Sequence, residues 1–217
     1  MESGDVLPAG RGAVALDRAE LRRRLPRFDA LPRTARVRGD HDLNPDMAPP
    51  ADPRPAAVLV PLVERDDGLT VLLTRRTDTL AAHAGQISFP GGGVEPGDAD
   101  ELAAALRETN EEIGLPPDRV DLIGRLDTYV TRTGFRVAPF VGLIRPPLVL
   151  RLDPNEVAEA FEVPLSVIVD PANPRRDSRY FNGKDRYFYV FPYQDRYIWG
   201  ATAGMLLNLR EALTGSC

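Results

Sequence analysis

The segment that most constrains the fold is a run of three glycines, Gly91–Gly93, between a short apolar strand pattern at Ile87–Phe89 and a long helical pattern. The helix is predicted from about Asp98 to Ile113, because Gly114 and the prolines beyond it are stop signals. Glycine has no Cβ, so its backbone can come close to a bound ion or phosphate. The order of strand, glycine turn, loop and helix therefore predicts a ligand site where the glycines meet the helix.

Strand and helix patterns are mixed irregularly along the rest of the chain. Apolar runs predict strands at Ala57–Val63, Leu69–Thr74, Val120–Val130, Phe135–Leu143 and Tyr187–Phe191. Amphipathic patterns predict helices at Pro164–Val169 and Ala201–Leu213. The first run is apolar almost throughout, which is typical of a strand covered on both faces. We predict the α/β (α+β) class, with a central mixed sheet and helices on both of its sides.

The N-terminal part is predicted to be an extension. Asp17 begins a short helical pattern with Glu20 three residues on, and Leu21 and Leu25 lie on one face of it. Repeated prolines follow, and each lacks a backbone donor, so an extended arm is expected. The predicted organisation is an extension over residues 1–50 and a single domain over residues 51–217.

The composition narrows the range of partners. The formal net charge is −5 and the isoelectric point is about 5.2, which argues against a protein that tracks nucleic-acid phosphates. No apolar run approaches the roughly 18 residues that a membrane span needs, and no secretory signal pattern is present at the N-terminus. Cys217 is the only cysteine, which excludes an intramolecular disulfide. We expect a cytoplasmic protein that acts on a small molecule.

The predicted helix has two distinct faces. A buried stripe is expected from Leu102, Ala105, Leu106, Thr109 and Ile113. Glu108, Glu111 and Glu112 share another face, because residues three and four apart are neighbours on a helix. Exposed like charges repel by roughly 0.2–0.5 kcal/mol per pair, whereas carboxylate oxygens are the ligands that Mg²⁺ or Mn²⁺ takes. A solvated acidic surface is the alternative, and the adjacent glycine run favours the metal site. Arg107 is spaced to pair with Glu111.

Residues Arg107–Leu115 have the sequence RETNEEIGL. Together with the preceding glycines, this stretch resembles the Nudix box, the loop–helix–loop motif of the Nudix hydrolases. The resemblance implies an α/β/α sandwich and metal-dependent hydrolysis of a diphosphate linkage. It also implies that the three glutamates bind Mg²⁺ or Mn²⁺, with a backbone carbonyl from Gly92 or Gly93. One position departs from the pattern: the glutamate expected eight residues before the arginine is Ala99, with Asp98 and Glu95 nearby.

Segments outside the box resemble the coenzyme A pyrophosphatase branch of this family. The matching stretches are Leu72–Thr77, Gly85–Gly92, Asn155–Val157 and Trp199–Ala203. Two positions depart: Thr77 stands where Ser or Ala is usual, and Ala81 where Arg is usual. The resemblance implies hydrolysis of coenzyme A to 3′,5′-ADP and 4′-phosphopantetheine.

Substrate binding is predicted for Arg75, Arg76, Gly91 and Gly92. Guanidinium groups bind phosphate oxygens in pairs, and glycine backbone allows close approach. Neighbouring residues on a strand point to opposite faces, so only one of the two arginines is expected to face the site.

The catalytic residues implied by the resemblance are Glu111, Glu156 and Arg107, with Glu156 or a box glutamate accepting the proton of the attacking water. Two alternatives stay open. One is a Nudix hydrolase of ADP-ribose or another nucleoside diphosphate derivative, and the other is a ligand-sensing Nudix module without turnover. The sequence also leaves a homodimer open.

Overall fold

The computed structural model describes residues 16–26, 37–78 and 84–215. Within these ranges the helices and strands follow in the order α1 (Arg18–Arg24), β1 (Arg38–Gly39), η1 (Asp40–Asp42), β2 (Arg54–Arg65), β3 (Gly68–Arg76), β4 (Ile87–Ser88), β5 (Gly91–Gly93), α2 (Glu101–Ile113), η2 (Pro117–Arg119), β6 (Val120–Arg125), β7 (Tyr129–Val130), β8 (Phe135–Ile144), β9 (Val157–Pro164), α3 (Leu165–Val169), β10 (Arg175–Phe181), β11 (Lys184–Tyr193), β12 (Arg196–Trp199) and α4 (Gly200–Thr214).

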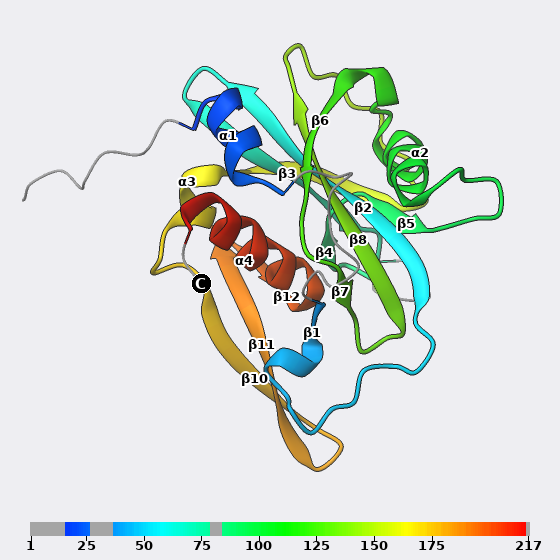
Figure 1. Cartoon of the computed structure of the whole chain (residues 1–217), viewed down its shortest axis with the longest axis vertical. Coiled ribbons are helices and arrows are strands. Elements are labelled where there is room, and N and C mark those ends of the chain that lie inside the picture. The colour runs from blue at the N-terminus through cyan, green and yellow to red at the C-terminus, as the bar shows by residue number, and fades with distance from the viewer. Residues whose placement is uncertain (1–15, 27–36, 79–83, 216–217) are drawn as a thin grey trace, which may run out of the picture.

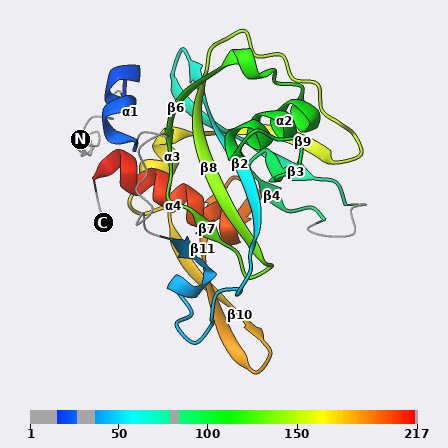
Figure 2. The same ribbon diagram turned by 45° about the vertical axis from the view of Figure 1, so that its right-hand side comes forward.

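The large sheet is mixed, as predicted. Its strands run in the order β1-β7-β8-β2-β3-β4, with β5 paired to β2, β6 to β8 and β9 to β3. Strand β2 is parallel to β8 and antiparallel to β3. Helix α2 covers one face, and α1, α3 and α4 lie on the other (Figures 1 and 2). The predicted α/β/α arrangement is therefore confirmed.

Strand β2 explains why helices are needed on both faces. Its inner residues are buried on both sides, as the continuous apolar run predicted. Ala56, Val60 and Leu62 join the core beneath α1, α3 and α4. The alternate residues, Ala57, Leu59 and Val63, pack in the clusters beneath α2. Side chains alternate across a strand, so one apolar sequence supplies both cores.

Helix α2 begins three residues later than predicted and ends where predicted. Asp100 is its N-cap and accepts a hydrogen bond from the Ala103 backbone N–H at 2.8 Å. Gly114 ends the helix in the left-handed conformation, with φ 68°. The expected buried stripe is present: Ala105, Thr109 and Ile113 are buried, and Leu102 and Leu106 are partly buried.

The glycine run is a strand rather than the predicted turn. Gly91–Gly93 form β5, which pairs antiparallel with Ala56–Val58 of β2. Gly91 has φ 146°, and a Cβ there would lie 2.3 Å from the backbone oxygen of Ala57. Glycine is therefore required for the backbones to approach.

Two further differences from the predicted elements concern strands. The predicted strand Val120–Val130 is divided into β6 and β7. Strands β10, β11 and β12 form a separate antiparallel sheet, of which only the aromatic part of β11 was predicted. In Figure 1 the β10–β11 hairpin projects away from the large sheet.

The described residues before β2 pack against the rest of the chain. Asp17 caps α1 by accepting from the Glu20 backbone N–H, as predicted, and Leu21 and Leu25 are buried. Strand β1 pairs parallel with β7. Ala81 and Cys217 lie outside the described residues. None of the described helices is long and apolar enough to cross a membrane.

Candidate functional site

The site forms where α2 lies over β5. The backbone N–H of Gly91 donates a hydrogen bond to Glu112 Oε2 at 3.1 Å. A Cβ on Gly92 would lie 2.5 Å from the carboxyl carbon of Glu108, so the glycine leaves the space that this carboxylate fills. The predicted glycines and two of the predicted metal ligands are therefore in direct contact.

Arg107 organises the outer part of the site. Its guanidinium makes two hydrogen bonds to Asp98, from Nε to Oδ1 and from Nη2 to Oδ2, each 2.9 Å long. Its Nη1 lies 3.0 Å from both Glu108 Oε1 and Glu111 Oε2, so the predicted pairing with Glu111 is present. Nη2 also donates to the Gly93 backbone oxygen at 3.2 Å. Asp98 thus anchors the arginine that holds two box glutamates.

Burial and charge shift the pKa values of the acids in opposite directions. Hydrogen bonds from Arg107 lower the pKa of Asp98 to about 2. Burial raises the pKa of Glu112 to about 7, and the nearby negative charges of Glu108 and Glu156 add to that shift. Burial also raises the pKa of Glu108. Glu108 and Glu112 are therefore protonated more readily than Asp98.

Arg76 faces Glu112 and Glu156, and Arg75 does not. Arg76 Nη1 lies 3.6 Å from Glu112 Oε1, and its Nη2 lies 3.9 Å from Glu156 Oε2. Arg75 instead lies 3.6 Å from carboxylate oxygens of Asp78 and Glu159. The register of β3 against β9 shifts between these two arginines. Of the two adjacent arginines, only Arg76 thus lies beside a box glutamate.

Backbone hydrogen bonds connect the Glu156 loop to the end of β3. Thr77 donates from its backbone N–H to the Glu156 backbone oxygen at 2.9 Å, and its Oγ1 donates to the Asn155 oxygen at 3.0 Å. The Glu156 side chain is 45% exposed. It is therefore within reach of solvent.

The donor chemistry of the site suits a hard divalent cation. Glu108, Glu111 and Glu112 offer carboxylate oxygens, and the backbone oxygens of Gly92 and Gly93 are adjacent. Glu108 and Glu111 are turned toward Arg107, and Glu112 toward Gly91. Over the part of the chain that the structure describes, no three His, Cys, Asp or Glu side chains converge closely enough to hold a metal. Binding a cation here requires these carboxylates to reorient.

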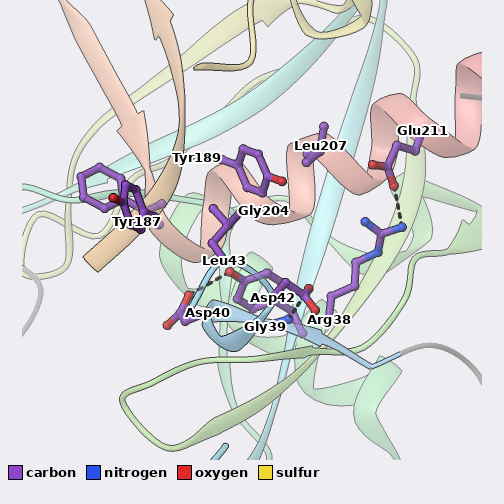
Figure 3. Close-up of a pocket in the computed structure, with 13 residues that line it drawn as sticks. Arg38, Gly39, Asp40, Asp42, Leu43, Tyr187, Tyr189, Gly204, Leu207 and Glu211 are labelled. Atoms are coloured by element: carbon purple, nitrogen blue, oxygen red, sulfur yellow. Dashed lines mark hydrogen bonds and ion pairs between the residues drawn. The ribbon is translucent and has the colours of Figure 1, made fainter. Parts of the chain in front are cut away.

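A separate pocket lies between η1, β11 and α4 (Figure 3). None of its lining residues belongs to α2, β3 or β5. Its charged side chains already have partners: Arg38 pairs with Asp127 and Glu211, and Asp40 accepts hydrogen bonds from Tyr129 Oη and the Arg132 backbone N–H. These contacts hold the N-terminal segment against the domain, which favours a structural role for the pocket.

Comparison with known proteins identifies the family. The NUDIX domain profile matches residues 53–182. An uncharacterized Nudix hydrolase, NudL, of Cronobacter sakazakii is 44% identical over 157 residues, which cover 72% of this chain and 81% of that protein. NudL of Escherichia coli, strain K12 / DH10B, is 41% identical over 157 residues, with the same coverage. The chain belongs to the Nudix family. Nudix hydrolases are pyrophosphohydrolases that act on small molecules and generally need divalent metal ions.

Two solved structures illustrate the likeness to other Nudix proteins. The Ap4A hydrolase of C. elegans, in a binary complex, has a TM-score of 0.45 and 24% identity, covering 51% of this chain and 80% of that one. The NUDIX domain of Shewanella oneidensis NrtR, in complex with ADP ribose, has a TM-score of 0.42 and 19% identity, covering 55% and 77%.

Asp98 anchors Arg107, and it lies next to Ala99, the position at which the Nudix pattern has a glutamate. Its folded-state pKa, about 2, lies below the ordinary 3.8, so the contact with Arg107 stabilises the fold above about pH 4 and is lost as the pH falls toward 2. We expect Asp98→Asn to lower the free energy of unfolding at neutral pH, with the difference from wild type shrinking between pH 4 and 2. Urea unfolding at a series of pH values measures this difference.

The matched control is Glu95→Gln, which neutralises an exposed acid in the same loop. It is expected to leave the unfolding free energy nearly unchanged, because surface charges contribute little. A difference between Asp98→Asn and wild type that stayed constant from pH 7 to 2 would contradict the assignment.

Proposed function

We propose that this Nudix hydrolase cleaves the diphosphate linkage of coenzyme A, giving 3′,5′-ADP and 4′-phosphopantetheine. The observation that carries the proposal is the position of the stretch that resembles the coenzyme A pyrophosphatase branch. This stretch, Leu72–Thr77 with Gly85–Gly92, comprises the end of β3, all of β4 and the start of β5. These are the elements that bring Arg76 and the glycines to the box glutamates.

Glu108, Glu111 and Glu112, with the backbone oxygen of Gly92 or Gly93, are proposed to hold Mg²⁺ or Mn²⁺. The bound cation would neutralise diphosphate charge and lower the pKa of a coordinated water. The tight fit of Glu108 against Gly92 and the burial of Glu112 support this ligand set. Glu111, whose side chain is 59% exposed, is free to turn from Arg107 toward the cation.

The remaining residues are proposed to orient the substrate and to move the proton. Arg76 would bind a diphosphate oxygen, because its guanidinium lies beside the acids rather than in close hydrogen bonds with them. Glu156, which is within reach of solvent, would accept the proton of the attacking water. Glu111 is the alternative base among the box glutamates. Arg107, held by Asp98, would stay beside Glu108 and Glu111 and offset part of their negative charge.

The proposal is tested by incubating the protein with coenzyme A, ADP-ribose and NADH, with and without Mg²⁺ or Mn²⁺, and separating the products by chromatography. We expect metal-dependent formation of 3′,5′-ADP from coenzyme A at a higher kcat/KM than for the other two substrates. Turnover of another diphosphate without coenzyme A cleavage would retain the family chemistry and reject this substrate. If none of the three substrates is cleaved, the result would favour a ligand-sensing module.

Glu112→Gln tests the proposed metal site separately from the choice of substrate. A glutamine oxygen can still accept the hydrogen bond from the Gly91 N–H, so the fold should be kept. We expect kcat to fall by about 10²–10³-fold, the usual effect of removing one transition-state electrostatic contact. Glu101→Gln removes a charge from the same helix, where the carboxylate binds Arg125 and Arg136 instead, and should retain kcat. An active Glu112→Gln enzyme would contradict the metal assignment.

Arg76→Ala and Arg75→Ala form a matched pair, because the two arginines are adjacent and only Arg76 faces the box. We expect Arg76→Ala to lower kcat/KM for coenzyme A by about 10²-fold, since a charged hydrogen bond to phosphate contributes about 1.5–3 kcal/mol. Arg75→Ala should change kcat/KM by less than about threefold. Steady-state kinetics measure both. Equal losses in the two variants would exclude a specific phosphate contact by Arg76.

A further inference from the structure

Strand β10 is a long, regular and exposed sheet edge. All seven of its residues are exposed, and its pairing with β11 runs without a register shift from Arg175↔Val190 to Phe181↔Lys184. No described strand lies on its other side. The sequence of β10, RRDSRYF, contains no proline. Proteins protect such an edge with proline, a bulge, a short strand or charged side chains, and four of the seven residues of β10 are charged. Pairing at this edge therefore requires a partner strand with complementary charges.

The hairpin turn determines which backbone groups face outward. Phe181 and Lys184 flank a two-residue turn, Asn182-Gly183, in which both residues have positive φ. The residues that flank such a turn form a hydrogen-bonded pair, and hydrogen-bonded pairs alternate along antiparallel strands. Residues 175, 177, 179 and 181 therefore bond toward β11. The backbone groups of Arg176, Ser178 and Tyr180 point to the open edge.

The sequence of β10 is complementary to itself when read antiparallel about Ser178. Arg175 then lies opposite Phe181, Arg176 opposite Tyr180, and Asp177 opposite Arg179. Two of these pairs are cation–aromatic and one is an ion pair, and each pair lies on one face of the strand. Ser178, whose backbone points outward, meets its own counterpart on the two-fold axis. Every arginine of the strand thus faces a ring or a carboxylate.

We propose that β10 is a self-association surface, on which β10 of a second copy of this chain adds antiparallel about a two-fold axis at Ser178. The paired strands join two three-stranded sheets into one continuous sheet, which is β-augmentation in a closed symmetric form. In the single chain the Asp177 carboxylate accepts from the outward Ser178 N–H at 2.7 Å and from Tyr197 Oη at 2.5 Å. On pairing, Asp177 exchanges the Ser178 N–H for Arg179 of the second copy.

Charge complementarity selects this register over its neighbours. Moving the two-fold axis to Asp177 places that carboxylate opposite itself, and moving the axis to Arg179 places two guanidinium groups together. Like charges directly opposite each other destabilise a strand pair. The hairpin also projects away from α2, so pairing leaves the box accessible (Figures 1 and 2).

The test exploits the symmetry of the ion pair. Asp177→Arg alone places arginine opposite arginine, and Arg179→Asp alone places aspartate opposite aspartate. An equimolar mixture of these two variants restores opposite charges in the heterodimer, and the double variant restores them in a homodimer. Sedimentation of the full-length protein over a micromolar concentration series should detect dimers of twice the 23.8 kDa chain mass for the wild type, the mixture and the double variant.

Each single variant should have a dimer dissociation constant at least about tenfold higher than the wild type. Asp185→Arg makes the same charge change on β11, away from the edge, and should dimerise as the wild type does. Circular dichroism verifies that each variant is folded. A wild-type protein that sediments as a single chain throughout would overturn the proposal. It would also fail if the single variants dimerised normally or if mixing them restored nothing.

Discussion

The site depends on how closely helix α2 approaches the sheet. Ala104 and Ala105 of the helix are fully buried with Ala57 of β2 and Ala138 of β8. Because these side chains are single methyl groups, the helix backbone can lie close to the strands at native packing density. That approach brings the Glu108 carboxylate against Gly92, where no Cβ fits. Small residues therefore set the geometry that the glutamates require.

Two arginines contact different acids of the site: Arg107 binds Asp98, Glu108 and Glu111, and Arg76 lies beside Glu112 and Glu156. They compensate the negative charge of these acids unequally. Arg107 makes direct hydrogen bonds at 2.9–3.0 Å, which is enough to keep Asp98 ionised well into acid. Arg76 lies 3.6 Å from Glu112 and does not form a hydrogen bond with it. Burial consequently dominates at Glu112, whose pKa rises to about 7. A divalent cation would supply the missing positive charge, in keeping with the metal requirement of Nudix hydrolases.

The sequence predicts the helix of the box better than its surroundings, for physical reasons. Helical spacing predicts the buried stripe that includes Ala105, Thr109 and Ile113, and glycine preference predicts the cap at Gly114; the structure confirms both. The sequence predicts a turn at the glycine run, because glycine favours turns in isolation. Its pairing with β2 depends on contacts distant in sequence. Asp98 could be noticed only as a nearby acid, since its bond to Arg107 requires the loop to fold back.

The sequence predicts only the aromatic part of β11 in the second sheet and does not predict β10, which lacks the alternation of apolar and polar residues on which strand prediction depends. All of its residues are exposed, so its pattern is dictated by what can lie opposite it rather than by a core. Within one chain Arg176 lies over the Tyr187 ring, Arg179 lies near the Trp199 ring and Asp177 accepts a hydrogen bond from Tyr197. In the proposed dimer, an antiparallel copy places a ring or a carboxylate opposite each arginine across the open edge as well. In such a strand, the order of charges and rings carries the information that hydrophobic periodicity carries in β2.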